Sequence, residues 1–134
     1  MYVSDIMPVL LAMNKINQER LADIKKGMPL TSWLDEIATI HLNLGRRTGK
    51  TEYISNNASD KDLVILPRGG MKHMYSSLLD LRTIEDMNIV GKFPVSPEVL
   101  WIDEPRMCGF TNLINTRMLA LRLDELKLII KLGE

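Results

Sequence analysis

The sequence predicts an α/β domain with three layers, in which helices cover both faces of a mostly parallel sheet of about four to five strands. Short apolar runs rich in Val, Ile and Leu recur along the chain, and segments with helical periodicity separate them. Strands that alternate with helices form parallel sheets. A length of 134 residues fits one domain of this kind. We therefore expect a single domain 1–134, with an N-terminal helical segment at 1–36 and a core at 37–134.

The N-terminal segment predicts two helices. Apolar side chains recur at helical spacing through residues 9–26, with polar and charged residues between them, which indicates a helix with one buried stripe. Residues 27–29, which include a glycine and a proline, end this helix. A second, short helix is expected at about 33–37, with Thr31 or Ser32 as its cap. The predicted stripe of the first helix comprises Val9, Leu10, Met13, Ile16, Leu21 and Ile24.

In the core, the apolar runs predict strands and the periodic segments predict helices. We expect strands at 39–44, 62–67, 99–103 and 126–132. Helices are expected from a glycine-bearing loop at 45–51 to about residue 56, at 71–82 and at 112–122, with a short edge piece at 88–95. Consecutive strands are thus separated by a helix or a long crossover, as a parallel sheet requires.

The composition is that of an ordinary folded protein. It is 46% hydrophobic and 25% charged, and 17 basic residues balance 17 acidic ones, so no global field attracts nucleic acid or a membrane. The single cysteine, Cys108, excludes an intramolecular disulfide and is expected to be a buried filler. The apolar stretch 6–13 is short and interrupted by Pro8, which predicts neither a signal peptide nor a membrane span. We expect a cytoplasmic protein, in the host cytoplasm if it is viral, with no membrane partner.

The segment Gly45-Arg46-Arg47-Thr48-Gly49-Lys50-Thr51 has the residues of a phosphate-binding loop between a strand and a helix. Gly49 lets the backbone approach a phosphate, the amides at the helix start bind oxyanions, Lys50 reaches the terminal phosphates and the Thr51 hydroxyl ligates magnesium. The usual pattern places its first glycine at position 44, where this chain has Leu44, and Gly45 follows one residue later. The alternative interpretation is an ordinary polar turn before a helix.

The run Val99-Leu100-Trp101-Ile102 ends in Asp103 and Glu104, and it predicts a buried strand whose carboxylates emerge at its C-terminal end. Open α/β sheets bind ligands at this end. Asp103 would hold Mg²⁺, and Glu104 would orient or deprotonate an attacking water. Alone, the pair could be a solvated strand end. Downstream of the loop, at a spacing that admits one intervening strand, it indicates a site for a nucleoside triphosphate and Mg²⁺.

Together the two segments resemble the Walker A and Walker B motifs of P-loop NTPases, in the additional-strand, catalytic-glutamate branch that holds RecA-like ATPases, helicases and phage terminases. The resemblance covers residues 37–134. The loop looks most like the arginine-bearing Walker A of phage terminase large subunits, which implies that Arg46, or Arg47 as second candidate, acts on the triphosphate in cis. The resemblance also implies that the last strand lies between the strands that carry the two motifs.

Two further segments are similar to parts of helicases in the same branch. Residues 64–68 resemble the strand and following segment that touch single-stranded nucleic acid, which implies a nucleic-acid contact for Arg68. Residues 128–134 resemble the strand that ends in a glycine and an acidic residue after the Walker B motif. An arginine after a strand is also often a solvated surface charge.

The expected function is Mg²⁺-dependent binding and hydrolysis of a nucleoside triphosphate, with ATP as the substrate. The resemblance implies that turnover is coupled to DNA, RNA or a protein partner, such as a motor or nuclease subunit or further copies of this chain. One alternative is a non-catalytic viral accessory or interaction protein built on a degenerate lobe, which the short chain and the displaced glycine favour. A second is a nucleoside or nucleotide kinase, although such enzymes carry an arginine-rich lid and residues 104–125 hold Arg106, Arg117 and Arg122 alone.

Overall fold

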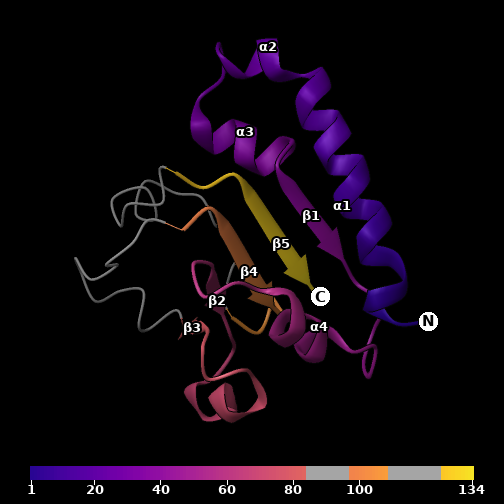
Figure 1. Ribbon diagram of the computed structural model, residues 1–134, viewed down its shortest axis with the longest axis vertical. Helices are drawn as coiled ribbons and strands as arrows, with labels where there is room; N and C mark the ends of the chain where they lie inside the picture. Colours follow the sequence, from indigo (N-terminus) through magenta and orange to yellow (C-terminus); the bar gives the residue numbers. More distant parts are fainter. Residues whose placement is uncertain (84–96, 109–124) are drawn as a thin grey trace.

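The computed structural model describes residues 1–83, 97–108 and 125–134 (Figure 1). The edge piece predicted at 88–95 and the helix predicted at 112–122 lie outside the described residues, as do Arg117 and Arg122.

The described strands form one sheet in which all neighbours are parallel. They are β1 (Thr39–Leu42), β2 (Leu63–Ile65), β3 (Asp80–Arg82), β4 (Val99–Asp103) and β5 (Leu128–Leu132). Their spatial order is β1-β5-β4-β2-β3. This confirms an α/β fold with a parallel sheet, and it confirms the expected place of the last strand between the strands at 39–42 and 99–103. Because all strands run the same way, their carboxyl ends meet at one edge, where the chain end and the start of α4 (Lys50–Asn57) also lie (Figure 1).

One face of the sheet is covered by α3 (Leu30–Glu36), as predicted for a short helix in this region. Trp33 and Leu34 of α3 pack with side chains from β2, β4 and β5, among them Ile102 and Ile129. The partly buried Leu21 joins this cluster, which brings the connection between the N-terminal helices onto the same face.

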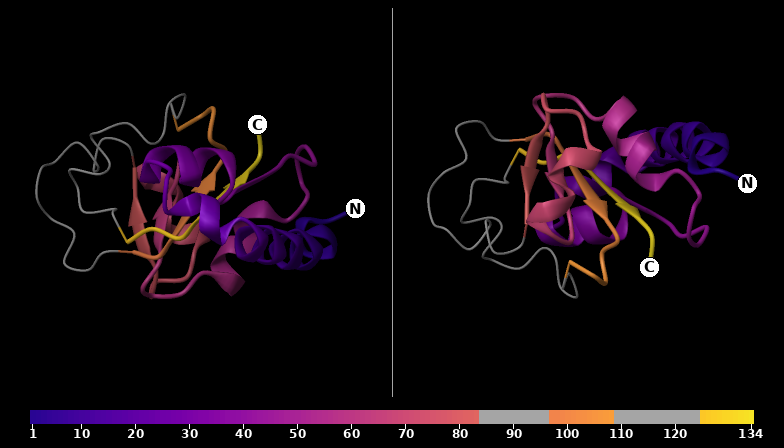
Figure 2. Two further views of the ribbon diagram at one scale, coloured as in Figure 1. Left: turned by 90° about the horizontal axis from the view of Figure 1, so that it is seen from above. Right: turned by 90° about the horizontal axis from the view of Figure 1, so that it is seen from below.

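The opposite face is covered by α1 (Val3–Arg20) and α4. Val3 and Met7 of α1 and Ile54 of α4 are fully buried against strand residues that include Trp101 and Ile130. Helices on both faces give the three layers that the sequence predicts. The views from above and below in Figure 2 place α1 and β3 at opposite ends of the sheet.

The N-terminal helix differs from its prediction. The helix α1 begins at Val3 rather than at residue 9, includes Pro8, and ends at Arg20, while residues 22–25 form the separate short helix α2 (Ala22–Lys25). The predicted stripe is wrong in four of its six members, because the side chains of Val9, Met13, Ile16 and Ile24 are 58%, 60%, 58% and 53% exposed. The side of α1 that packs on the sheet is set by Val3 and Met7, which lie before the predicted start of the helix at residue 9.

The helix predicted at 71–82 is also wrong. A 3-10 helix, η1 (Gly69–Met74), is followed by a turn, in which the Leu79 amide donates to the Ser76 carbonyl at 3.2 Å, and then by β3, which pairs with β2. Two glycines open this region, and the backbone amide of Ser76 donates to Ser55 Oγ of α4 at 2.8 Å, which ties the turn to that helix. Leu79 and Leu81, whose spacing favoured a helix, contact the α1/α4 face from the strand and its approach.

The remaining elements agree with their predictions to within a few residues. The helix after the loop extends to Asn57, and the strands β1, β2 and β5 each lie inside a predicted range. Among the described helices, none combines the length and the hydropathy that crossing a membrane requires.

Candidate functional site

The two segments singled out in the sequence meet at the carboxyl edge of the sheet. Residues 43–49 lead from β1 to α4, and β4 ends at Asp103 beside them. Thr51 Oγ1 donates to Asp103 Oδ2 at 2.7 Å, and Lys50 Nζ lies 2.8 Å from Glu104 Oε1. Residues more than 50 positions apart therefore form two direct side-chain pairs. The structure brings together the four residues for which we predicted roles with phosphate, metal and water.

The loop is shaped by residues with positive φ. Gly45 has φ +87° and Gly49 has φ +78°, a region that glycine enters without strain, and Arg47 lies between them at φ +56°. Asn43 Oδ1 accepts the Gly45 amide at 3.0 Å and closes a tight turn there. Leu44 is half-buried and packs against the α1/α4 face. The glycine displaced by one position is thus the residue that makes the turn, while Leu44 anchors the loop to the core.

Backbone amides at the loop and helix start are unpaired within the described residues. The first amide of α4 with a helical acceptor is that of Tyr53, which donates to the Gly49 carbonyl at 2.8 Å. The amides of residues 46–49 make no hydrogen bond in the described part of the chain. The Thr48 carbonyl accepts the Val3 amide at 2.8 Å, so the start of α1 fixes the loop. Free amides at a helix N-terminus favour an anion.

Lys50 points into this loop and is 9% exposed. Its ammonium group donates to the Gly45 carbonyl at 2.7 Å in addition to its ion pair with Glu104. The Gly45 carbonyl also accepts Thr48 Oγ1 at 3.0 Å. The lysine cation therefore lies against the loop, between the Gly45 carbonyl and the carboxylate of Glu104.

Asp103 is 1% exposed and is held by several donors. Its Oδ2 atom accepts the Tyr75 hydroxyl at 2.5 Å as well as that of Thr51, and its carbonyl accepts the thiol of Cys108 at 3.1 Å. Burial and the nearby Asp103 charge raise the pKa of Tyr75 well above its ordinary range. Burial, with the charges of Asp103 and Glu104, raises the pKa of Cys108 to about 12. Both groups therefore stay protonated at neutral pH, and each acts as a donor.

Glu104 continues β4 into the site with φ +54°. Its amide donates to the Leu132 carbonyl at 2.8 Å, and its Oε2 atom accepts the Glu134 amide at 3.2 Å. A Cβ atom placed on Gly133, which has φ +111°, would lie 2.5 Å from Oε2. The carboxylate of Glu104 thus occupies the space that the missing side chain of Gly133 leaves.

A cavity of about 500 Å³ opens beside Glu104 and the loop. Arg46 lines it, together with Arg106, whose guanidinium pairs with Glu134 at 2.8 Å. Arg47 is exposed and does not line this cavity, and Arg68, which is exposed and directly precedes η1, does not line it either. The remaining lining residues are Asn43, Gly45, Met107 and Glu134.

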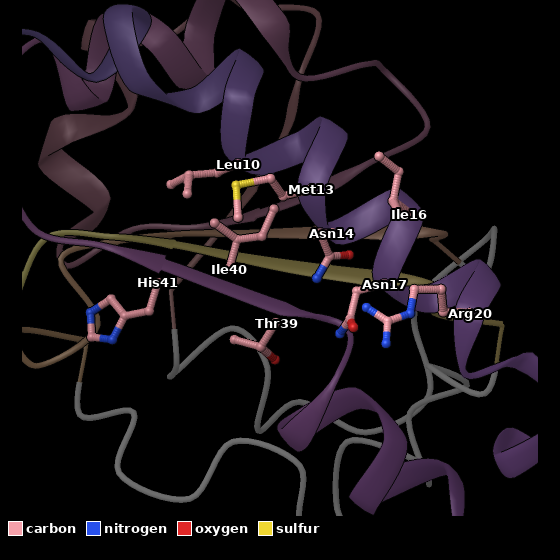
Figure 3. A pocket seen from close by; sticks show the side chains of 9 residues that line it. All are labelled: Leu10, Met13, Asn14, Ile16, Asn17, Arg20, Thr39, Ile40 and His41. Carbon is pink, nitrogen blue, oxygen red and sulfur yellow. The ribbon is translucent and has the colours of Figure 1, made fainter.

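A second cavity, also of about 500 Å³, lies between α1 and β1, which is an edge strand of the sheet among the described residues (Figure 3). Leu10, Met13 and Ile40 gather at one end of it, and Asn17 and Arg20 lie at the other. None of the predicted site residues lines this cavity. Apolar side chains provide most of its surface, whereas the charged residues of the cavity beside Glu104 are Arg46 of the loop and, outside the loop, Glu104, Arg106 and Glu134.

The residues present fit a magnesium ion that is shared with phosphate. The hydroxyl oxygen of Thr51 and the carboxylate of Asp103, which a hydrogen bond of 2.7 Å holds together, are oxygen donors of the kind that Mg²⁺ prefers. No group of three or more His, Cys, Asp or Glu side chains among the described residues could hold a metal alone. Magnesium commonly uses one or two carboxylates and completes its shell with substrate phosphates and water.

The sequence did not predict that Tyr75 donates to Asp103, or that Gly133 leaves space for the carboxylate of Glu104. Tyr75 lies in a region we predicted as a helix, and nothing in its local sequence relates it to Asp103. Gly133 carried a signal, because a glycine directly after a strand marks a close approach or a positive φ. His41 is exposed on β1, and its Nε2 lies 2.7 Å from the Gly133 carbonyl.

No family model, curated protein or solved structure matches the chain.

Proposed function

We propose that this protein binds a nucleoside triphosphate, with ATP as the substrate, at the loop 45–51 and hydrolyses it with Mg²⁺. The observation that carries the proposal is the double pairing of the loop with the end of β4: Thr51 with Asp103, and Lys50 with Glu104. The parallel sheet brings the two segments to the same edge, but it does not by itself pair Thr51 with Asp103 and Lys50 with Glu104. A phosphate and metal site requires this pairing, because one cation must touch both segments.

The pairing between Lys50 and Glu104 supports a role for both residues in the reaction. A terminal phosphate that enters the loop offers Lys50 a stronger anionic partner than Glu104. Glu104 is then released to accept a proton from, or orient, an attacking water beside the cavity. The loop amides and Lys50 neutralise charge on the phosphates as it develops. Bound Mg²⁺ would supply further neutralisation between the phosphate oxygens, held by Thr51 and Asp103.

Arg46 is the better placed of the two loop arginines to stabilise the transition state. Arg46 and Glu104 both line the cavity beside the loop, and Arg47 does not line it. Arg47 stays the second candidate. Arg106 shares the cavity but pairs with Glu134, so we assign it no catalytic role.

The arrangement of the sheet supports membership of the additional-strand, catalytic-glutamate branch of P-loop NTPases. That branch implies a strand between the two motif strands, and β5 occupies this position. It also implies that hydrolysis serves a partner. We propose DNA or RNA, a motor or nuclease subunit, or further copies of this chain as that partner, with Arg68 as a contact for nucleic acid.

Calorimetric titration with ATP and a slowly hydrolysed analogue, together with phosphate release, tests the proposal. We expect the wild type to bind and turn over ATP with Mg²⁺, Lys50→Ala to lose binding, and Glu104→Gln to bind without turnover. Lys127→Ala and Glu98→Gln are matched controls, because these residues form an exposed ion pair 3.2 Å long outside the site. Equal turnover in all five proteins, or no binding by the wild type, would overturn it.

One observation favours the alternative of an interaction protein built on the same lobe. The Gly45 carbonyl accepts hydrogen bonds from both Lys50 and Thr48, so these two side chains have partners within the loop itself. In that case the pairing of Lys50 with Glu104 is a structural bridge, and Lys50→Ala lowers the melting temperature while the wild type binds no nucleotide. The titration above distinguishes the two functions, since it measures binding before turnover.

A further inference from the structure

Tyr75 brings a buried hydroxyl to Asp103 from a part of the chain outside both motifs. We propose that Tyr75 is a positioning residue that orients the Asp103 carboxylate for a divalent cation and thereby sets the gain in nucleotide affinity that Mg²⁺ provides. The inference rests on the proposed function, because it concerns the metal of the same site. It adds a residue that neither the loop nor the strand motif contains.

The contacts of Asp103 carry the inference. The hydroxyls of Tyr75 and Thr51 both donate to Oδ2, at 2.5 Å and 2.7 Å, and Asp103 Oδ1 has no hydrogen-bond partner among the described residues. Two donors on one oxygen fix the plane of the carboxylate and leave the other oxygen as a ligand. Hydrogen bonds to a charged acceptor are stronger than neutral ones, so this orientation is well held.

Tyr75 is itself held rigidly with respect to the metal site. It is 6% exposed, and its amide donates to the Lys72 carbonyl at the end of η1. The next residue, Ser76, donates through its amide to Ser55 Oγ at 2.8 Å. Ser55 and Thr51 lie one turn apart on α4, so the same helix that carries the candidate magnesium ligand also fixes the position of the phenol.

A structural role alone would not require this acceptor. A buried tyrosine hydroxyl needs one partner, and a backbone carbonyl would satisfy it. Here the partner is the carboxylate that the proposed function assigns to the metal. Residues that orient metal ligands affect metal affinity about 10- to 100-fold when they are removed. We expect an effect of this size on the metal-dependent part of nucleotide binding.

The test compares the dissociation constant of ADP in saturating Mg²⁺ with that in EDTA, for the wild type, Tyr75→Phe and Tyr53→Phe. The dissociation constant in EDTA divided by that in Mg²⁺ measures how much the metal strengthens ADP binding, without turnover. We expect Tyr75→Phe to lower this ratio about tenfold or more and to leave the dissociation constant in EDTA unchanged. Tyr53→Phe is the matched control, because it removes a hydroxyl from a buried tyrosine of the same face that does not contact Asp103.

The outcomes separate the inference from the proposed function. If the wild type binds ADP more tightly with Mg²⁺ and Tyr75→Phe shows the same ratio or a larger one, the role of Tyr75 is overturned and the proposed function stands. If the wild type binds no ADP, both fall. An equal loss of affinity in Mg²⁺ and in EDTA would assign Tyr75 a general structural role and also overturn the inference.

A measurement on the wild type covers the case in which Tyr75→Phe does not fold. The chain has three tyrosines, so in protein labelled with ¹³C at the phenol carbon the Tyr75 signal is the one retained in both Tyr2→Phe and Tyr53→Phe. We expect this signal to move when Mg²⁺ and ADP are added, and to move less with ADP and EDTA. An identical response under the two conditions would contradict the proposed contact with the metal site.

Discussion

Gly133→Ala should separate nucleotide binding from hydrolysis. The added Cβ would lie 2.5 Å from Oε2, 2.6 Å from Cδ and 2.9 Å from Oε1 of Glu104. To restore ordinary van der Waals contact, which begins at 3.4 Å, the carboxylate must move by roughly 1 Å. Misplacement of a reacting group by this amount costs about 10²-fold in rate. The loop amides and Lys50 are not displaced by the methyl group, so binding of ATP should persist.

The same substitution has a cost in stability that can be measured separately. Gly133 has φ +111°, and a residue with a side chain in such a region costs about 1–3 kcal/mol. For a domain of this size, a loss of 1 kcal/mol lowers the melting temperature by roughly 4 °C. We therefore expect Gly133→Ala to melt at least about 4 °C below the wild type and still to be folded at the temperature of the assay.

Phosphate release, ADP binding and thermal melting are measured on Gly133→Ala and on Gly70→Ala. Gly70 is the matched control, because a Cβ there meets no atom within 4 Å and its backbone is not in the left-handed region. The control should behave like the wild type in all three assays. If Gly133→Ala turns over ATP at the wild-type rate, Glu104 does not depend on the space beside Gly133. If Gly133→Ala has the same melting temperature as Gly70→Ala, the expected backbone strain at position 133 is absent.

Four further predictions follow from burial and charge. Cys108, whose pKa burial and Asp103 raise to about 12, should react with Ellman's reagent at pH 8 only after unfolding. The folded chain holds the thiol proton of Cys108 more tightly than the unfolded chain does. The protonated thiol therefore contributes fully to the free energy of unfolding below pH 9, and this contribution declines towards pH 12. The urea midpoint should fall over that range, and it should fall less in Cys108→Ala. Ile102→Ala, at a fully buried position, should cost about 2–5 kcal/mol by urea unfolding. Arg106→Ala should cost less than about 1 kcal/mol in the same experiment, because its pair with Glu134 is exposed.

Local patterns in the sequence were sufficient for the class of fold and for most of the strands. Runs such as 99–103 and 128–132 are apolar on both faces, which indicates buried parallel strands whatever their neighbours are. The helix that follows Gly49 was also predictable, because a glycine at its start and polar residues in its first turn are local signals. The place of the last strand, between those at 39–42 and 99–103, was expected from the resemblance of two motifs and not from periodicity.

Periodicity was misleading where burial depends on a distant surface. The apolar positions of 9–26 have helical spacing, but which side of α1 is buried depends on how Val3 and Met7 meet the sheet. Leucines at 78–81 also have helical spacing, yet the chain forms a turn and then β3 there, because the edge of β2 offers a ladder and the Ser76 amide bonds to Ser55 Oγ of α4. Tertiary contacts decide between two local structures of similar free energy.

In the candidate site too, the sequence indicated some residues and the tertiary structure added the others. The sequence alone indicated Lys50, Thr51, Asp103 and Glu104, because the chemistry of phosphate and magnesium restricts the residue types and the motifs are contiguous. The tertiary structure decided that Lys50 pairs with Glu104 in the absence of a ligand, and that Gly133 makes room for that carboxylate. It also brought Tyr75 to Asp103. A hydrogen bond between residues 28 positions apart depends on the order of strands and the path of a crossover, and no local pattern encodes either of them.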